Sequence, residues 1–200
     1  MNTFLGGAWE AEAWGKAIGG DPDAFAEIFD AHRDRVFGHS LRLIRSIPDA
    51  EDVTALVFLE AWRRRAAVRV VEGSIIGWLL VTANYVVRNH TRSLRRHQVA
   101  MRKMPPSPVE EDHADRVLDA LETDGRASQM RQAFGQLSAR EQDIITLCVF
   151  EQQTTAQASE ALHIPVGTVK SRLSRAKARL SGLMSTSSSS THTLPEGSLL

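Results

Sequence analysis

Apolar side chains recur every three to four residues through most of the chain, which is the spacing of amphipathic helices. In the first half, the pattern predicts helices over 9–18, from Asp21-Pro22 onward, over 49–69 and over 75–96. Asp21 is the expected N-cap of the second helix and Pro22 its first helical residue. The best strand candidate, 68–71, is short and interrupted by an arginine, so no strand is predicted.

The second half repeats this helical pattern in shorter pieces. A helix is expected from about Gly125, and two capping boxes, Ser138 with Glu141 and Thr154 with Gln157, mark the starts of two more. The sequence His163-Ile164-Pro165 breaks the pattern, because a residue before proline is pushed out of the helical region. A last helix restarts near 167–168. Its expected core face is Val169, Leu173, Ala176 and Leu180.

Between the two halves, residues 104–124 combine three prolines with an acidic segment that has little apolar surface to bury. The predicted fold is therefore all-α: two small helical domains joined by a flexible linker, with a helix-turn-helix in the C-terminal domain. The predicted boundaries are 1–97 for the first domain, 98–125 for the linker, 126–184 for the second domain and 185–200 for a disordered, serine-rich tail.

Composition narrows the class of protein. Hydrophobic residues make up 42% of the 200 residues, as in ordinary globular proteins, and no apolar run approaches the ~20 residues that a membrane span needs. The N-terminus lacks the pattern of a secretory signal. The one cysteine, Cys148, lies in an apolar run and is expected to be a small core residue. These features predict a cytoplasmic protein without membrane insertion.

The net charge is zero, but the charges are segregated. Residues 1–62 carry eleven acidic and five basic side chains, whereas 63–103 carry ten basic and one acidic. Residues 110–124 hold seven acids, and no acid follows Glu160 until Glu196. Two basic blocks that coincide with predicted helices indicate two DNA-contacting surfaces. In a helix-turn-helix, such a basic second helix lies in the major groove, with its first residues against base edges.

Four segments resemble bacterial sigma factors of the extracytoplasmic-function group. In order along the chain they read DPDAFAEIFDAHRDRVFGHSLRLI, DAEDVTALVFLEAWRR, GWLLVTANYVVRNHTRSLRR and, from Thr154, TTAQASEALHIPVGTVKSRLSRAKARL. The resemblance covers roughly 21–96 and 131–183. It implies a protein that binds core RNA polymerase and directs it to promoters, with promoter DNA and an anti-sigma factor as further partners and with no cofactor.

The resemblance also implies which residues act. Core polymerase would dock on Asp49, Glu51, Asp52, Leu56 and Phe58, where an acidic and apolar surface suits a basic partner. The −10 promoter element would be opened and held by Asn84, Tyr85, Arg88, Asn89 and Arg92, since amides and arginines pair with base edges and a tyrosine can stack on a base. The −35 element would be bound by Thr168, Lys170, Ser171, Arg172, Ser174, Arg175 and Arg179.

The sequence departs from the family pattern at one turn, and several interpretations stay open. His163 stands where the family usually has glycine, so a left-handed turn there costs roughly 1 kcal/mol. Tyr85 can be a core aromatic or a base-stacking one. His32 and His39 are spaced by seven, as are His90 and His97, and these histidines are expected to be structural. No metal site or catalytic group is predicted. Alternatives to a sigma factor are a sigma-like decoy that binds an anti-sigma factor, a dimeric helix-turn-helix regulator and a helical enzyme.

Overall fold

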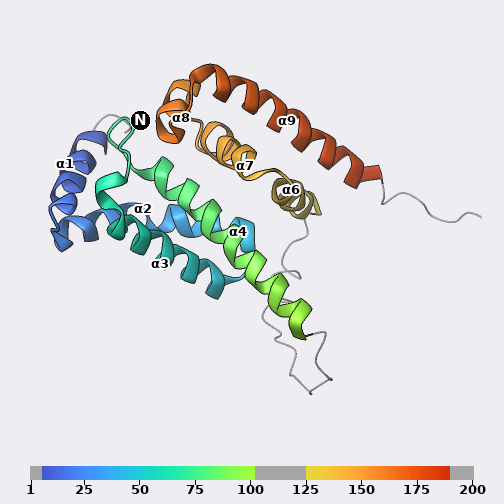
Figure 1. Ribbon diagram of the computed structural model, residues 1–200, viewed down its shortest axis with the longest axis horizontal. Coiled ribbons are helices and arrows are strands. Elements are labelled where there is room, and N and C mark those ends of the chain that lie inside the picture. The colour runs from blue at the N-terminus through green and yellow to red at the C-terminus, as the bar shows by residue number, and fades with distance from the viewer. Residues whose placement is uncertain (1–5, 102–124, 190–200) are drawn as a thin grey trace, which may run out of the picture.

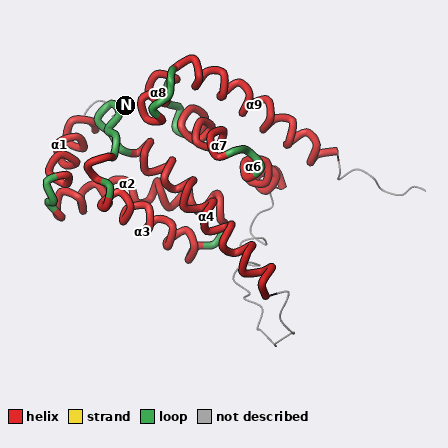
Figure 2. The backbone as a smooth tube through the Cα atoms, viewed as in Figure 1, coloured by secondary structure: helices red, strands yellow, loops and turns green. Residues whose placement is uncertain are grey.

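The computed structural model describes residues 6–101 and 125–189. Figure 1 shows two groups of helices, one from each half of the chain, lying against each other. Within the described ranges no β-strand occurs (Figure 2), and only Val71 and Ser74 form an isolated antiparallel bridge. The predicted all-helical, two-domain fold is confirmed. None of the described helices combines the length and apolar character of a membrane span.

The N-terminal domain consists of α1 (Gly6–Ile18), α2 (Pro22–Ile44), α3 (Ile47–Arg63) and α4 (Ile76–Met101). Asp21 caps α2 as predicted, because its Oδ1 accepts hydrogen bonds from the backbone N–H groups of Asp23 (3.0 Å) and Ala24 (3.2 Å). The cap satisfies donors that have no partner within the helix.

Helix α3 differs from the predicted 49–69 at both ends. It begins at Ile47, with Ser46 as N-cap, because Pro48 is tolerated in a first turn that needs no donor. It ends at Arg63, and a short 3-10 turn, Arg65–Ala67, leads into the loop before α4. Residues 64–69, which were expected to continue the helix, therefore form a turn and part of a loop.

The core of this domain is formed by apolar side chains from all four helices. Fully buried members include Trp14, Ile28, Val36, Val53, Val57, Ile75, Leu79 and Leu80. Phe25, Phe29, Phe58 and Trp62 add edge-on aromatic contacts with ring centroids 4.7–6.4 Å apart. The apolar periodicity of α3 also predicts that Leu56 is buried, and this prediction is wrong, because the residue is 50% exposed.

The C-terminal domain consists of α6 (Gly125–Gly135), α7 (Ala139–Ile145), a π-helical turn η2 (Thr146–Phe150), α8 (Thr155–Leu162) and α9 (Val166–Ser189). Both predicted capping boxes are present. Ser138 and Glu141 bond reciprocally at the start of α7, and Thr154 and Gln157 do so at the start of α8.

The turn between α8 and α9 confirms the expectation for His163. Its backbone is left-handed, with φ 54° and ψ 47°, a conformation that side chains other than glycine adopt at a cost. Helix α9 then begins at Val166 and extends through Ser189, so the first part of the predicted tail is helical. Helix α4 likewise continues past 97, and residues 102–124 of the predicted linker lie outside the described residues.

Candidate nucleic-acid and polymerase-binding surfaces

Helix α9 presents its cations to solvent on one side and packs on the domain with the other. Val169 and Ala176 are fully buried and Leu180 nearly so. Five of the predicted −35 residues, Lys170, Ser171, Ser174, Arg175 and Arg179, are exposed, and Thr168 and Arg172 are half-buried. The face therefore has the shape and charge of a recognition helix.

Two arginines of this face already have partners within the domain. Arg179 lies 3.5 Å from the Glu141 carboxylate and donates to the carbonyl oxygen of Gln136 (3.3 Å), while Arg175 donates to the carbonyl of Ser171 (3.3 Å). Hydrogen bonds from Ser138, and then the charges of Arg179 and Arg175, hold the pKa of Glu141 below its usual value. Arg179 is thus tied to the start of α7.

Helix α3 carries the predicted polymerase-docking residues. Glu51 and Asp52 are exposed, whereas Asp49 is half-buried with its carboxylate 3.4 Å from His90 Nε2. Leu56 is 50% exposed, and sequence reasoning missed Leu59, which is 51% exposed. The helical spacing of Asp52, Leu56 and Leu59 was the signal that could have found it, because these residues share one face.

Phe58 is buried at 3% exposure, yet it lines a shallow apolar pocket of about 310 Å³. The pocket lies between α2 and α3 and is lined by Pro22, Phe25, Phe58, Leu59 and Trp62. Exposed acidic and apolar side chains on the same helix form a surface suited to a partner that is basic and partly apolar.

Helix α4 divides the predicted −10 residues into two groups. Tyr85 is 59% exposed and is therefore not a core residue. Arg92 is also exposed. Asn89 is half-buried. Asn84, in contrast, is 1% exposed and Arg88 is half-buried, and both are engaged with the C-terminal domain.

A polar network connects the two domains at this point. The Oδ1 of Asn84 accepts from His39 Nε2 (2.9 Å), while its Nδ2 donates to Asp143 (3.1 Å) and to the hydroxyl of Thr146 (3.0 Å). Arg88 donates to Gln142 (3.0 Å) and lies 3.4 Å from the same Asp143 oxygen.

Burial dominates the protonation of this network. Burial lowers the pKa of His39 to about 4. The hydrogen bond to Asn84 raises this pKa, whereas the charge of Arg42 lowers it further. Burial raises the pKa of Asp143, partly offset by Arg88 and Asn84. Sequence reasoning noted His39 only for its spacing from His32 and gave no signal for this junction.

The other buried histidine also has a structural partner. Glu10 of α1 accepts from His32 Nε2 (2.8 Å), from the Ser74 hydroxyl (3.1 Å) and from the backbone N–H of Ile75 (2.7 Å), which ties α1 to the start of α4. Among the described residues, no group of three or more metal-binding side chains is placed to hold an ion.

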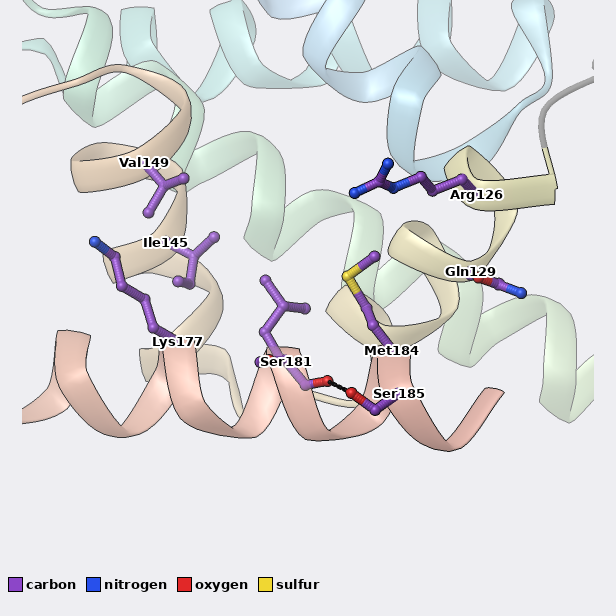
Figure 3. A pocket seen from close by; sticks show the side chains of 9 residues that line it. Arg126, Gln129, Ile145, Val149, Lys177, Ser181, Met184 and Ser185 are labelled. Carbon is purple, nitrogen blue, oxygen red and sulfur yellow. Dashed lines mark hydrogen bonds between the residues drawn. The ribbon is translucent and has the colours of Figure 1, made fainter. Parts of the chain in front are cut away.

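A groove of about 590 Å³ runs along the C-terminal domain between α6, α7 and α9. Figure 3 shows Ile145, Val149 and Met184 pointing into it, with Lys177 and Arg126 at its edges. Its described lining holds no carboxylate, histidine or cysteine that could serve as an acid, base or nucleophile.

This fold and these surfaces define a two-domain, all-helical DNA-binding protein with a helix-turn-helix in its second domain. Comparison with protein families matches residues 28–97 to sigma-70 region 2 and residues 127–180 to sigma-70 region 4. The chain belongs to the sigma-70 family of RNA polymerase sigma factors, in its extracytoplasmic-function group.

Curated relatives agree. The chain is 29% identical over 153 residues to the ECF RNA polymerase sigma factor SigK of Mycobacterium sp. (strain KMS), covering 76% of this chain and 79% of the relative. It is 27% identical over 160 residues to SigK of Mycobacterium tuberculosis (strain ATCC 25177 / H37Ra), covering 79% of this chain and 84% of the relative.

Two solved structures share the fold at 19% identity. The sigma factor RpoE, in complex with the anti-sigma factor NepR from Bartonella quintana, gives a TM-score of 0.52 over 80% of this chain and 96% of that chain. CnrH, in complex with the cytosolic domain of CnrY, gives a TM-score of 0.57 over 89% of this chain and 98% of that chain.

Proposed function

We propose that this sigma factor binds core RNA polymerase through α3, opens the −10 promoter element with α4 and reads the −35 element with α9. The observation that carries the proposal is the one-sided α9, whose cations face solvent while Val169 and Ala176 are fully buried. A helix anchored in this way can enter the major groove without unfolding its own domain.

The position of each side chain along α9 suggests its role. Lys170, Ser171, Ser174 and Arg175 lie in the first turns, where base edges are within reach, so these residues would specify the sequence. Thr168 and Arg172 would contact phosphates. Arg179 lies a turn later and is held near Glu141, so it would add affinity without specificity.

Docking on polymerase would use the exposed part of α3. Glu51, Asp52, Leu56 and Leu59 offer charge and apolar area together, and the pocket floored by Phe58 would receive an apolar side chain. Asp49, which lies close to His90, would contribute less directly.

On α4, the exposed Tyr85 is suited to stacking on an unpaired base, and Arg92 to a phosphate. Asn84 and Arg88 would join them once the C-terminal domain has moved away. The family relationship further supports a cytoplasmic protein without catalytic residues of its own, in which polymerase performs the chemistry. It also supports control by an anti-sigma factor.

The docking proposal is tested by reversing charge on α3. The double variant Glu51→Lys/Asp52→Lys should lose co-purification with core RNA polymerase while keeping its helical content, because both side chains are exposed. Glu27→Lys/Asp30→Lys is the matched control, since it makes the same charge change on exposed positions of α2. If the α3 variant co-purifies as the control does, this face is not the docking surface.

A further inference from the structure

A cleft of about 890 Å³ lies between the two domains, where the end of α2 and the middle of α4 face α6. The domains approach each other closely at the start of α4, since a Cβ atom on Gly77 would lie 3.1 Å from the Gln153 side chain. Further along α4, Asn84 donates to Asp143 and to Thr146. These contacts fix the two sides of the cleft relative to each other.

The charge of the cleft is one-sided. Its described lining contains four arginines and no carboxylate, and these arginines are Arg45, Arg88, Arg92 and Arg131. Three of them belong to the N-terminal domain, whereas Arg131 belongs to α6. A cleft whose charges all have one sign focuses the electric field and raises the local concentration of counter-ions. The lining therefore favours an anion.

A buried amide fixes the position of Arg88. Gln142 is 5% exposed, donates from Nε2 to the carbonyl oxygen of Phe134 (2.9 Å) and accepts from Arg88 Nη1 (3.0 Å). Within the described part of the chain, the hydrogen bonds of Arg88 all use Nη1, so Nε and Nη2 are left to donate to a ligand. A guanidinium that is held in place beforehand loses less conformational entropy when a ligand binds.

The rest of the lining combines apolar and uncharged polar side chains. Leu43, Ile44 and Val87 supply apolar surface, and Thr91 and Ser128 supply hydroxyl groups. A cavity of this volume, with a few charged groups and apolar surface beside them, has the usual make-up of a site for a small molecule.

We propose that this cleft binds an oligophosphate anion, either free or carried by a nucleotide. Guanidinium groups form paired, charge-assisted hydrogen bonds with phosphate oxygens, and consecutive phosphates offer such a partner to several arginines at once. Because Arg131 lies on the other domain, one ligand would bridge the two domains. Arg88 and Arg92 are also predicted to bind the −10 element, so the ligand would compete with promoter DNA. That consequence rests on the proposed function, whereas the binding site itself does not.

Isothermal titration calorimetry on the full chain tests the site, with tripolyphosphate and ATP as separate probes and without divalent cations. We expect one equivalent of probe to bind. The double variant Arg45→Gln/Arg131→Gln should weaken binding about tenfold or more, because a hydrogen bond to a charged group contributes at least that factor. Arg63→Gln/Arg140→Gln is the matched control. It removes the same charge from exposed positions outside the cleft, so at ~0.15 M salt the affinity should change less than about twofold.

A second pair of variants tests the location without removing an arginine. Thr91→Glu places a carboxylate in the cleft, whereas Ser93→Glu adds the same charge to α4 outside the cleft lining. Both positions are exposed, so both variants should keep the helical content of the parent. Tripolyphosphate should bind about tenfold more weakly to Thr91→Glu and less than about twofold more weakly to Ser93→Glu, since charge interactions fall with distance and with screening.

The chain itself carries a second candidate anion. Residues 110–124 contain seven acids and directly precede α6. A tethered competitor acts at an effective concentration of about 1 mM, so replacing the seven acids by their amides should raise tripolyphosphate affinity about tenfold or more if this segment occupies the cleft. Such a gain would overturn the proposal, and a smaller one supports it.

The two probes distinguish the sources of the ligand. Tighter binding of ATP than of tripolyphosphate would assign the site to nucleotides, and equal or weaker binding of ATP would assign it to free oligophosphates. If neither probe binds at about 1 mM, or if the cleft variants and their controls lose affinity equally, the proposal is overturned. Docking on polymerase is measured separately with the α3 variant, so failure of the cleft site and failure of the proposed function give different results.

Discussion

Asn84 illustrates how a single polar side chain can join two domains. Its amide is buried yet fully bonded, with His39 on the same domain and Asp143 and Thr146 on the other. A buried amide with partners costs little, whereas one left without partners costs roughly 1–3 kcal/mol. The buried Asn84 amide therefore keeps its full set of partners only as long as the C-terminal domain is in place.

His39 gives this junction a pH dependence. Its pKa falls from 6.5 in the unfolded chain to about 4 in the folded protein, so the unfolded state binds more protons between these values. The contribution of His39 to the free energy of unfolding is therefore fully present above pH 6.5. It declines as the pH falls toward 4, by roughly 3 kcal/mol in total. The charged and polar groups facing His39 are Arg42 and Asn84, and the Phe150 ring lies at 6.4 Å.

Urea unfolding of wild type and His39→Gln across this pH range measures the effect. The variant keeps an amide donor for Asn84 but has no proton to take up, so its stability should decline less as the pH falls. Asp143, whose pKa is raised, acts in the opposite sense in both proteins and cancels in the difference. Parallel curves for the two proteins would show that His39 does not titrate in this way.

His163 stores strain in the turn of the helix-turn-helix. Since its φ is 54°, His163→Gly should raise the free energy of unfolding by about 0.5–1 kcal/mol, because glycine adopts this conformation without steric cost. Ala161→Gly, in the adjoining helix, should lower it by up to about 1 kcal/mol. A midpoint of urea unfolding that falls for His163→Gly would indicate that the imidazole makes a stabilising contact.

Local signals in the sequence were sufficient to locate most helices. The caps at Asp21, Ser138 and Thr154 were predicted because each depends on residues within three positions of one another. The end of α3 was not predicted, since the apolar spacing of the following turn mimics a helix. The core face of α9 followed from periodicity, whereas Leu56 of α3 was expected to be buried and is exposed.

Helix α9 should separate specificity from affinity. Arg175→Ala should relax the preference at one base position by roughly 1–3 kcal/mol, the value of an arginine paired with guanine. Arg179→Ala should instead weaken binding to all sequences alike and lower the salt dependence by at most about one phosphate contact, because Glu141 already shares its charge. Binding of the full-length proteins, with core polymerase, to matched and scrambled promoter fragments across a salt series measures both. Identical behaviour would mean that α9 holds the backbone without reading sequence.

The whole molecule differs from the sum of its two predicted domains. Charge blocks and capping signals located the helices that are predicted to contact DNA, but they contain no information on which faces of the two domains meet. The burial of Asn84 and the approach at Gly77 depend on residues more than fifty positions away, such as Asp143 and Gln153. Such contacts are visible only once the domains are seen together.

The role of the chain as a sigma factor is tested by run-off transcription with purified core RNA polymerase on fragmented genomic DNA. Wild-type protein should produce defined transcripts that core enzyme alone does not make, and Asn84→Ala/Arg88→Ala should reduce them through poorer promoter melting, seen as lower permanganate reactivity, while still binding polymerase. If core enzyme made the same transcripts with and without the protein on every fragment, the result would contradict the assignment.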